Sequence, residues 1–123
     1  MSERHKHILE RANAASRAGD VEGFLQNCTE DTVWTFVGEQ TLVGKGAVRA
    51  WLNDAYKTPP EFEVYRMVAE GDFLTAIGEI VLVDENGKGA RHAYCDVWSF
   101  RDGLLDTLHA FVVKGSIQRG AFA

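Results

Sequence analysis

The second half of the chain consists of four apolar runs separated by short turn sequences, and this pattern limits the possible fold more than any other feature. The turns EGD, DENGKG and RDG are rich in residues that tolerate positive φ or bond to their own backbone. Because each connection is so short, consecutive strands must lie side by side and run antiparallel. The predicted strands of this meander are Phe62–Ala69, Phe73–Val83, Ala90–Phe100 and Leu104–Val113.

The first half of the chain shows helical spacing instead. Apolar side chains recur three or four residues apart over residues 5–15 and 48–56, and a short helix follows the AGD sequence at 18–20. Residues 31–38, DTVWTFVG, are β-branched and aromatic and predict a strand. Helices followed by a meander predict an α+β fold in one domain, residues 1–123. In this fold a curved antiparallel sheet forms a cone closed by three N-terminal helices.

Charge and cysteine content exclude several classes of protein. The net charge of −5 is spread along the chain without a basic stripe, so we expect no nucleic-acid partner. No apolar run is long enough to span a membrane, and the N-terminal residues are charged, so we expect a cytoplasmic protein without membrane contact. Cys28 and Cys95 and the four histidines lack metal-ligand spacing, so we expect reduced thiols, no metal and no cofactor.

One predicted strand carries a carboxylate where an apolar side chain would be expected. In HAYCDVWSF, residues 92–100, strand alternation places Tyr94, Asp96 and Trp98 on one face. A carboxylate between two aromatic side chains is costly to bury without a partner. Two interpretations stay open: a structural carboxylate satisfied by a hydrogen bond, or an acid in a pocket. In the second case burial would raise its pKa.

Four short motifs, in this order, resemble the nuclear transport factor 2-like superfamily, which includes ketosteroid isomerases and SnoaL-like polyketide cyclases. The motifs are AGDVEGF, CTEDTVW, LVGKGAVRAWL and DVWSFRDGLLDTLHAFV, and the resemblance runs from about Ile8 to Val113. It implies the cystatin-like cone with a pocket inside. It also implies that Asp96 lies where the isomerases carry an oxyanion-hole aspartic acid. The isomerase base position falls on Thr35, which cannot accept a proton near neutral pH, and the tyrosine position falls on Ala12. The usual ketosteroid isomerase mechanism is therefore not expected.

Combined with strand parity, the resemblance predicts the site residues. Asp96 is the predicted catalytic acid or base, and no metal ligand is predicted. The predicted ligand-binding residues are Thr35, Trp51, Tyr56, Tyr94, Trp98, Leu108 and Ala110.

The opposite sheet face is predicted to be an association surface. We expect His109 to lie there rather than in the pocket, and Glu79 to be exposed on it. Val97, Phe111 and Val113 make this face too apolar to be fully wet. Because family members commonly pair through it, we expect a two-fold homodimer.

These observations leave three functions open. The first is an enzyme that applies acid–base chemistry through Asp96 to a hydrophobic carbonyl or polycyclic substrate, as an isomerase or cyclase does. The second is a domain that binds a small apolar molecule without catalysis. The third is an association domain whose cavity is filled by its own side chains.

Overall fold

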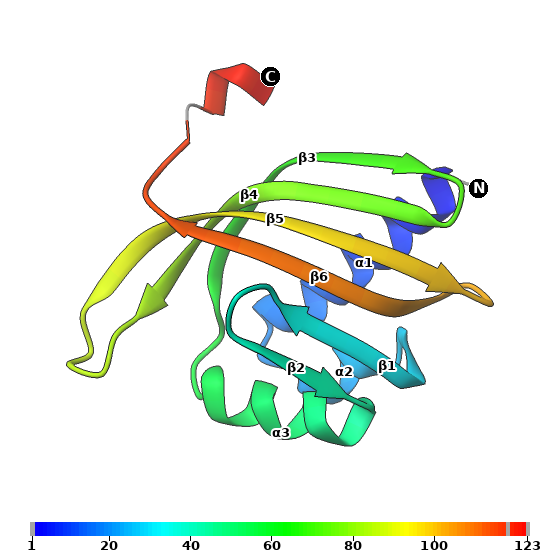
Figure 1. The fold of residues 1–123 in the computed structure, drawn as a ribbon, viewed down its shortest axis with the longest axis horizontal. Helices are drawn as coiled ribbons and strands as arrows, with labels where there is room; N and C mark the ends of the chain where they lie inside the picture. Colours follow the sequence, from blue (N-terminus) through cyan, green and yellow to red (C-terminus); the bar gives the residue numbers. More distant parts are fainter. Residues whose placement is uncertain (1, 118, 123) are drawn as a thin grey trace.

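The computed structural model describes residues 2–117 and 119–122, and its fold belongs to the expected α+β class. A curved, unclosed six-stranded sheet is covered on one face by helices (Figure 1). The elements are α1 (Ser2–Arg17), α2 (Val21–Leu25), β1 (Cys28–Phe36), β2 (Gln40–Val43), α3 (Lys45–Ala55), β3 (Glu61–Glu70), β4 (Phe73–Val83), β5 (Gly89–Arg101), β6 (Leu104–Lys114) and the 3-10 helix η1 (Arg119–Phe122).

The sheet has the strand order β2-β1-β6-β5-β4-β3, and its last four strands form the predicted meander in antiparallel pairs. Two features differ from the sequence prediction. The short strand β2 was not predicted, and β1 pairs with β6 in parallel rather than antiparallel. The parallel pair is possible because β2, α3 and the first three meander strands intervene between β1 and β6 in the sequence, so no tight turn has to join them.

The residues between the first two helices end one helix and begin the next, as predicted. Asp20 begins α2, and its carboxylate accepts a hydrogen bond from the Gly23 backbone N–H at 2.9 Å. Gly19 takes the positive φ of 75° that ends α1. This short link joins α1 to α2, and Figure 1 shows both helices behind the sheet and α3 below it, next to β2.

A glycine in β4 makes room for a long tyrosine contact. The Tyr94 hydroxyl donates a hydrogen bond of 3.0 Å to the Glu63 carbonyl, next to a bulge in β3 between Val64 and Arg66. The ring has to pass over Gly78 to reach it. A Cβ atom at Gly78 would lie 1.9 Å from that carbonyl oxygen and 2.7 Å from the tyrosine hydroxyl. Gly78 is therefore required for this packing.

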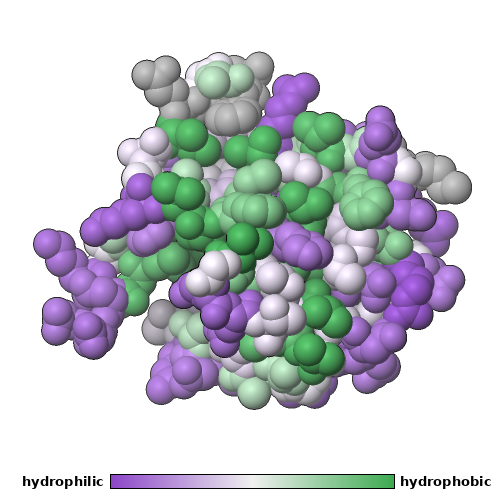
Figure 2. Space-filling view, viewed as in Figure 1, coloured by the Kyte–Doolittle hydropathy of each residue, from purple (hydrophilic) through white to green (hydrophobic). Residues whose placement is uncertain are grey.

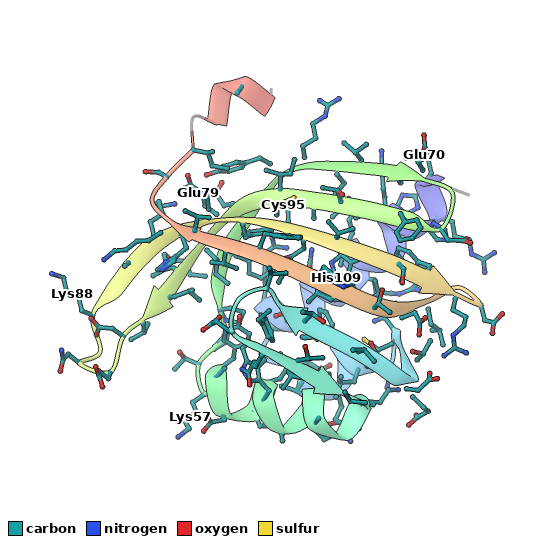
Figure 3. The ribbon with its side chains drawn as sticks, in the orientation of Figure 1. Lys57, Glu70, Glu79, Lys88, Cys95 and His109 are labelled. Atoms are coloured by element: carbon teal, nitrogen blue, oxygen red, sulfur yellow. The ribbon has the colours of Figure 1, made fainter. Side chains whose placement is uncertain are left out.

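The outer sheet face holds the predicted apolar residues, together with one buried acid. His109 lies on this face and is exposed, as predicted (Figure 3). Phe111 and Val113 are 46% and 68% exposed, and Figure 2 shows apolar side chains gathered over these strands. The prediction for Glu79 was wrong in part: it lies on this face but is only 4% exposed.

The burial of Glu79 has a clear physical cause. Its carboxylate accepts a hydrogen bond from the Ile117 backbone N–H at 2.6 Å and pairs with Arg91 at 2.8 Å. These bonds, together with one from Tyr65, lower the pKa of Glu79. The backbone donor, Ile117, lies in the segment after β6, which has no helix or strand pattern, so this contact could not be predicted from the sequence.

Candidate active site

A cavity of about 200 Å³ lies between the inner sheet face and the helices, and it opens to solvent. Its volume is sufficient for a small organic molecule, since a cavity of about 150 Å³ binds benzene. Its lining is mostly apolar and aromatic. The lining residues are Leu9, Asn13, Ser16, Phe24, Trp34, Phe36, Glu39, Trp51, Leu52, Tyr56, Pro60, Phe62, Ala76, Ile80, Leu82, Tyr94, Asp96, Trp98, Leu108, Ala110 and Val112.

The register of the sheet explains why the cavity lies over Asp96. Its cross-strand partners are Ala76 on β4 and Ala110 on β6, and both are buried. Along its own strand the side chains on the same face are the much larger Tyr94 and Trp98. Two methyl groups thus flank the carboxyl group across the sheet, while aromatic rings flank it along the strand. Asp96 lies in a recess that the small neighbours leave unfilled.

In the described part of the chain, the Asp96 carboxyl group has no protein partner. Within residues 2–117 and 119–122 it makes no hydrogen bond and no ion pair, and burial is the sole cause of the change in its pKa. Burial raises this pKa from 3.8 to about 7, because the charged form loses hydration that nothing replaces. At neutral pH the protonated and ionised forms therefore coexist.

The two cavity tyrosines differ in what their hydroxyl groups do. Tyr94 is committed to the Glu63 carbonyl and contributes its ring to the wall. Burial raises the pKa of Tyr56 to about 12, and the negative charge of Asp96 adds to this effect. The Tyr56 hydroxyl thus lies within the electrostatic reach of Asp96 and stays a neutral donor.

Aromatic rings in edge-to-face or tilted contact form the rest of the wall. Trp34 and Trp98 meet edge to face with ring centroids 5.5 Å apart, and Trp51 packs against Phe36 at 4.6 Å and Tyr56 at 5.5 Å. Such contacts fix the rings in place. The Trp34 indole N–H is buried without a partner in the described part of the chain.

Seven of the eight predicted site residues lie together around this cavity. They are Trp51, Tyr56, Tyr94, Asp96, Trp98, Leu108 and Ala110. Their placement agrees with strand parity and with the helical spacing of α3.

Thr35 is the exception, and its placement in the pocket was wrong. It lies opposite His109 in the register of β1 and β6, and its hydroxyl is 3.5 Å from that of Thr41. Side chains alternate between the two faces of a strand, so the inner positions of β1 belong to Trp34 and Phe36 instead.

The sequence reasoning missed the polar side chains that α1 contributes. Leu9, Asn13 and Ser16 are spaced four and three residues apart, so they share one helix face, and all three line the cavity. The helical spacing predicts that these residues share one face, but the prediction used only the apolar residues of α1 and left out Asn13 and Ser16. Ala76 and Ile80 on β4 and Glu39 in the β1–β2 turn were missed as well.

The described residues give no basis for placing a metal ion. Among them, no three histidine, cysteine, aspartate or glutamate side chains are grouped as metal ligands would be. Burial raises the pKa of the Cys28 thiol to about 12, so this thiol stays protonated. Asp96 is therefore the one strongly perturbed carboxyl group among the cavity residues that the structure describes.

Comparison with known proteins agrees with this geometry. The model of the SnoaL-like domain matches residues 9–106, which is most of the chain. The chain belongs to the SnoaL-like family. None of the curated proteins matches this family member by sequence. In the described part of the chain, no helix has both the length and the apolar character needed to cross a membrane.

Solved structures similar to this SnoaL-like protein share its fold at low sequence identity. The epoxide hydrolase/cyclase-like enzyme SalBIII, which has a role in pyran ring formation in salinomycin, is 20% identical with a TM-score of 0.82 over 89% of this chain and 91% of its own. A putative polyketide cyclase from Xanthomonas campestris pv. campestris is 17% identical, with a TM-score of 0.80 and coverage of 89% and 90%. A putative ketosteroid isomerase from Kribbella flavida DSM 17836 is 15% identical, with a TM-score of 0.79 and coverage of 95% and 83%.

Proposed function

We propose that this protein is an enzyme that binds a small apolar carbonyl compound and moves one of its protons through Asp96, as in isomerase or cyclase chemistry. The observation that carries the proposal is the unpartnered carboxyl group of Asp96 at the floor of an aromatic cavity, with a pKa of about 7. A group with this pKa is suited to proton transfer at neutral pH because it is neither a very weak base nor a very weak acid.

A single carboxyl group is enough for such chemistry. Ionised Asp96 removes a proton from the carbon next to the carbonyl, and the electron pair of the C–H bond moves to the carbonyl oxygen as an enolate. The protonated acid then returns the proton to a different carbon, which completes an isomerisation. Alternatively, the enolate attacks a second carbonyl carbon in the same molecule, and Asp96 protonates the oxygen that becomes an alkoxide, which closes a ring. The neutral Tyr56 hydroxyl is available as a donor to the developing negative charge.

The names of the similar structures support this class of reaction. Two of them are called a cyclase or cyclase-like enzyme and one a ketosteroid isomerase. The fold hosts many chemistries, so the argument for this protein depends on its own cavity.

The test is deuterium exchange at the carbon next to the carbonyl of a bicyclic aromatic ketone, 2-acetylnaphthalene, followed by NMR in D₂O. We expect the protein to accelerate exchange, with a rate that falls as the pH drops below 7 and Asp96 becomes protonated. Asp96→Asn should abolish this acceleration but retain ketone binding. Asp54→Asn, which changes an exposed aspartate on α3, is the matched control and should behave like the native protein. Unchanged exchange in Asp96→Asn would contradict the proposal.

A second function is favoured by one observation. The inner face of β1, next to the site where the isomerases carry a base, presents the apolar Trp34 and Phe36 to the cavity. A cavity with so few ionisable groups also suits a domain that only binds. Ketone binding without accelerated exchange would support that function.

We also propose that a second copy of the chain covers the outer sheet face. This proposal is supported by Phe111 and Val113, which share one face of β6 and are both exposed. In a monomer these apolar side chains would be in contact with water.

A further inference from the structure

Asn13 is a polar side chain that faces the cavity from the side of the helices. It lies on α1 between Leu9 and Ser16, which line the same cavity, and it is half-buried. Its neighbours on α1, Ile8, Leu9 and Ala12, are buried in the core. The amide group is therefore presented at an otherwise apolar helix surface.

The Asn13 amide makes no hydrogen bond within the described residues, although it can donate two and accept two. Asn27, the other asparagine packed against the helices, shows the contrast. Its amide donates to the carbonyls of Gly23 and Phe24 at 3.1 and 3.5 Å and accepts from Arg11 at 3.3 Å. Asn27 thus has an evident structural role, whereas no described residue forms a hydrogen bond with the Asn13 amide.

A polar group in an apolar cavity lowers stability unless something satisfies it. Polar groups of this kind commonly orient a ligand in pockets whose other walls are apolar. Asp96 lies on the sheet side of this cavity and Asn13 on the α1 side, so the two groups approach a bound molecule from different walls. An amide both donates and accepts, so it can bind either a hydroxyl or a carbonyl group.

We propose that Asn13 is a specificity-determining residue and that the substrate carries two oxygen functions on an apolar ring system. One is the carbonyl next to the carbon from which Asp96 removes a proton, and the other is a hydroxyl or carbonyl bound by the Asn13 amide. This inference rests on the proposed function for the role of the first oxygen. It adds the second oxygen, which fixes the direction in which the substrate enters.

The test compares 2-acetylnaphthalene with its hydroxy derivatives, which keep the ketone and the rings and add a hydroxyl group at different positions. Dissociation constants are measured by titration calorimetry at pH 6, where Asp96 is mostly protonated. The variant Asn13→Leu removes the amide at similar volume. Asn53→Leu is the matched control, because Asn53 is also helical but is exposed on α3 outside the cavity.

We expect the native protein to bind the best hydroxy isomer about threefold to tenfold more tightly than the parent ketone, the range of one net hydrogen bond. Asn13→Leu should reduce this ratio to about one while leaving the affinity for the parent ketone within about twofold. Asn53→Leu should keep the native ratio. A merely structural Asn13 would weaken both ligands together. If circular dichroism shows that Asn13→Leu is unfolded, Asn13→Ala takes its place with the same expectation.

The outcomes separate this inference from the proposed function. If the parent ketone binds and exchanges its proton but the ratio survives in Asn13→Leu, the role of Asn13 is overturned and the function of Asp96 stands. If no hydroxy isomer exceeds the parent ketone in the native protein, the second oxygen is overturned as well. If neither ketone nor isomers bind, both the inference and the proposed function fail.

Discussion

Replacing Asp96 by asparagine should make the protein more stable at high pH and leave its stability nearly unchanged at low pH. The pKa of Asp96 is about 7 in the folded protein and 3.8 ordinarily, so the folded state binds the proton more tightly than the unfolded state does. Its contribution to stability is complete below pH 3.8, decreases as the pH rises, and is lost above about pH 7. Asparagine has no such pH dependence.

The size of the effect follows from the two pKa values. The difference between 3.8 and about 7 corresponds to about 4 kcal/mol in the free energy of unfolding, since each tenfold change in proton affinity contributes about 1.4 kcal/mol. Asp96 is half-buried in front of an open cavity, so water screens part of this cost, and we expect about 2 kcal/mol to be measured. The titratable side chains that share the cavity, Glu39, Tyr56 and Tyr94, remain in both proteins.

The assay is urea unfolding followed by tryptophan fluorescence, between pH 4 and pH 8.5. The quantity of interest is the free energy of unfolding of Asp96→Asn minus that of the native protein, because the other titrating groups cancel. This difference should rise from near zero at pH 4 to about 2 kcal/mol at pH 8. A difference that is flat across this range would refute the reasoning and make Asp96 an ordinary solvated carboxylate.

Glu79 provides a control of opposite sign. Its pKa is lowered, first by the hydrogen bond from Ile117, so its contribution is present above the ordinary value of 4.5 and is lost as the pH falls through the lower folded value. Glu79→Gln should therefore destabilise the protein at pH 7, and the destabilisation should shrink toward acid pH. If both variants changed in the same direction with pH, the cause would be global rather than local.

Two further predictions concern packing and assembly. Gly78→Ala should lower the free energy of unfolding by about 3 kcal/mol or more, because its Cβ would collide with a carbonyl and a hydroxyl oxygen. Gly46→Ala on α3, where a Cβ would meet no described atom within 4 Å, is the control and should change this free energy by less than about 1 kcal/mol. Equal urea midpoints for the two variants would contradict the requirement for glycine at position 78. The native chain should have a dimeric mass by light scattering at micromolar concentration. Because Phe111 lies on the apolar outer face, Phe111→Lys should make the protein monomeric and leave its circular dichroism unchanged. A monomeric native chain would exclude the dimer.

The sequence alone determined the fold class and seven of the residues that line the cavity. Short turns force antiparallel neighbours, and strand alternation then decides which side chains share a face. Strand alternation placed Asp96, Tyr94 and Trp98 on one face, and the family resemblance added Leu108 and Ala110 beside them. Periodicity works for these residues because they lie inside long, regular elements whose geometry depends on local sequence.

The tertiary structure decided the features that depend on pairing between distant segments. The parallel pairing of β1 with β6 and its register set which side chains of β1 face the cavity, so Trp34 and Phe36 are inside and Thr35 is not. The burial of Glu79 came from a backbone N–H 38 residues away. Asn13 became part of the site only when α1 packed across the sheet. The sequence around a residue does not specify which distant group will contact it, because such contacts form only when the chain packs.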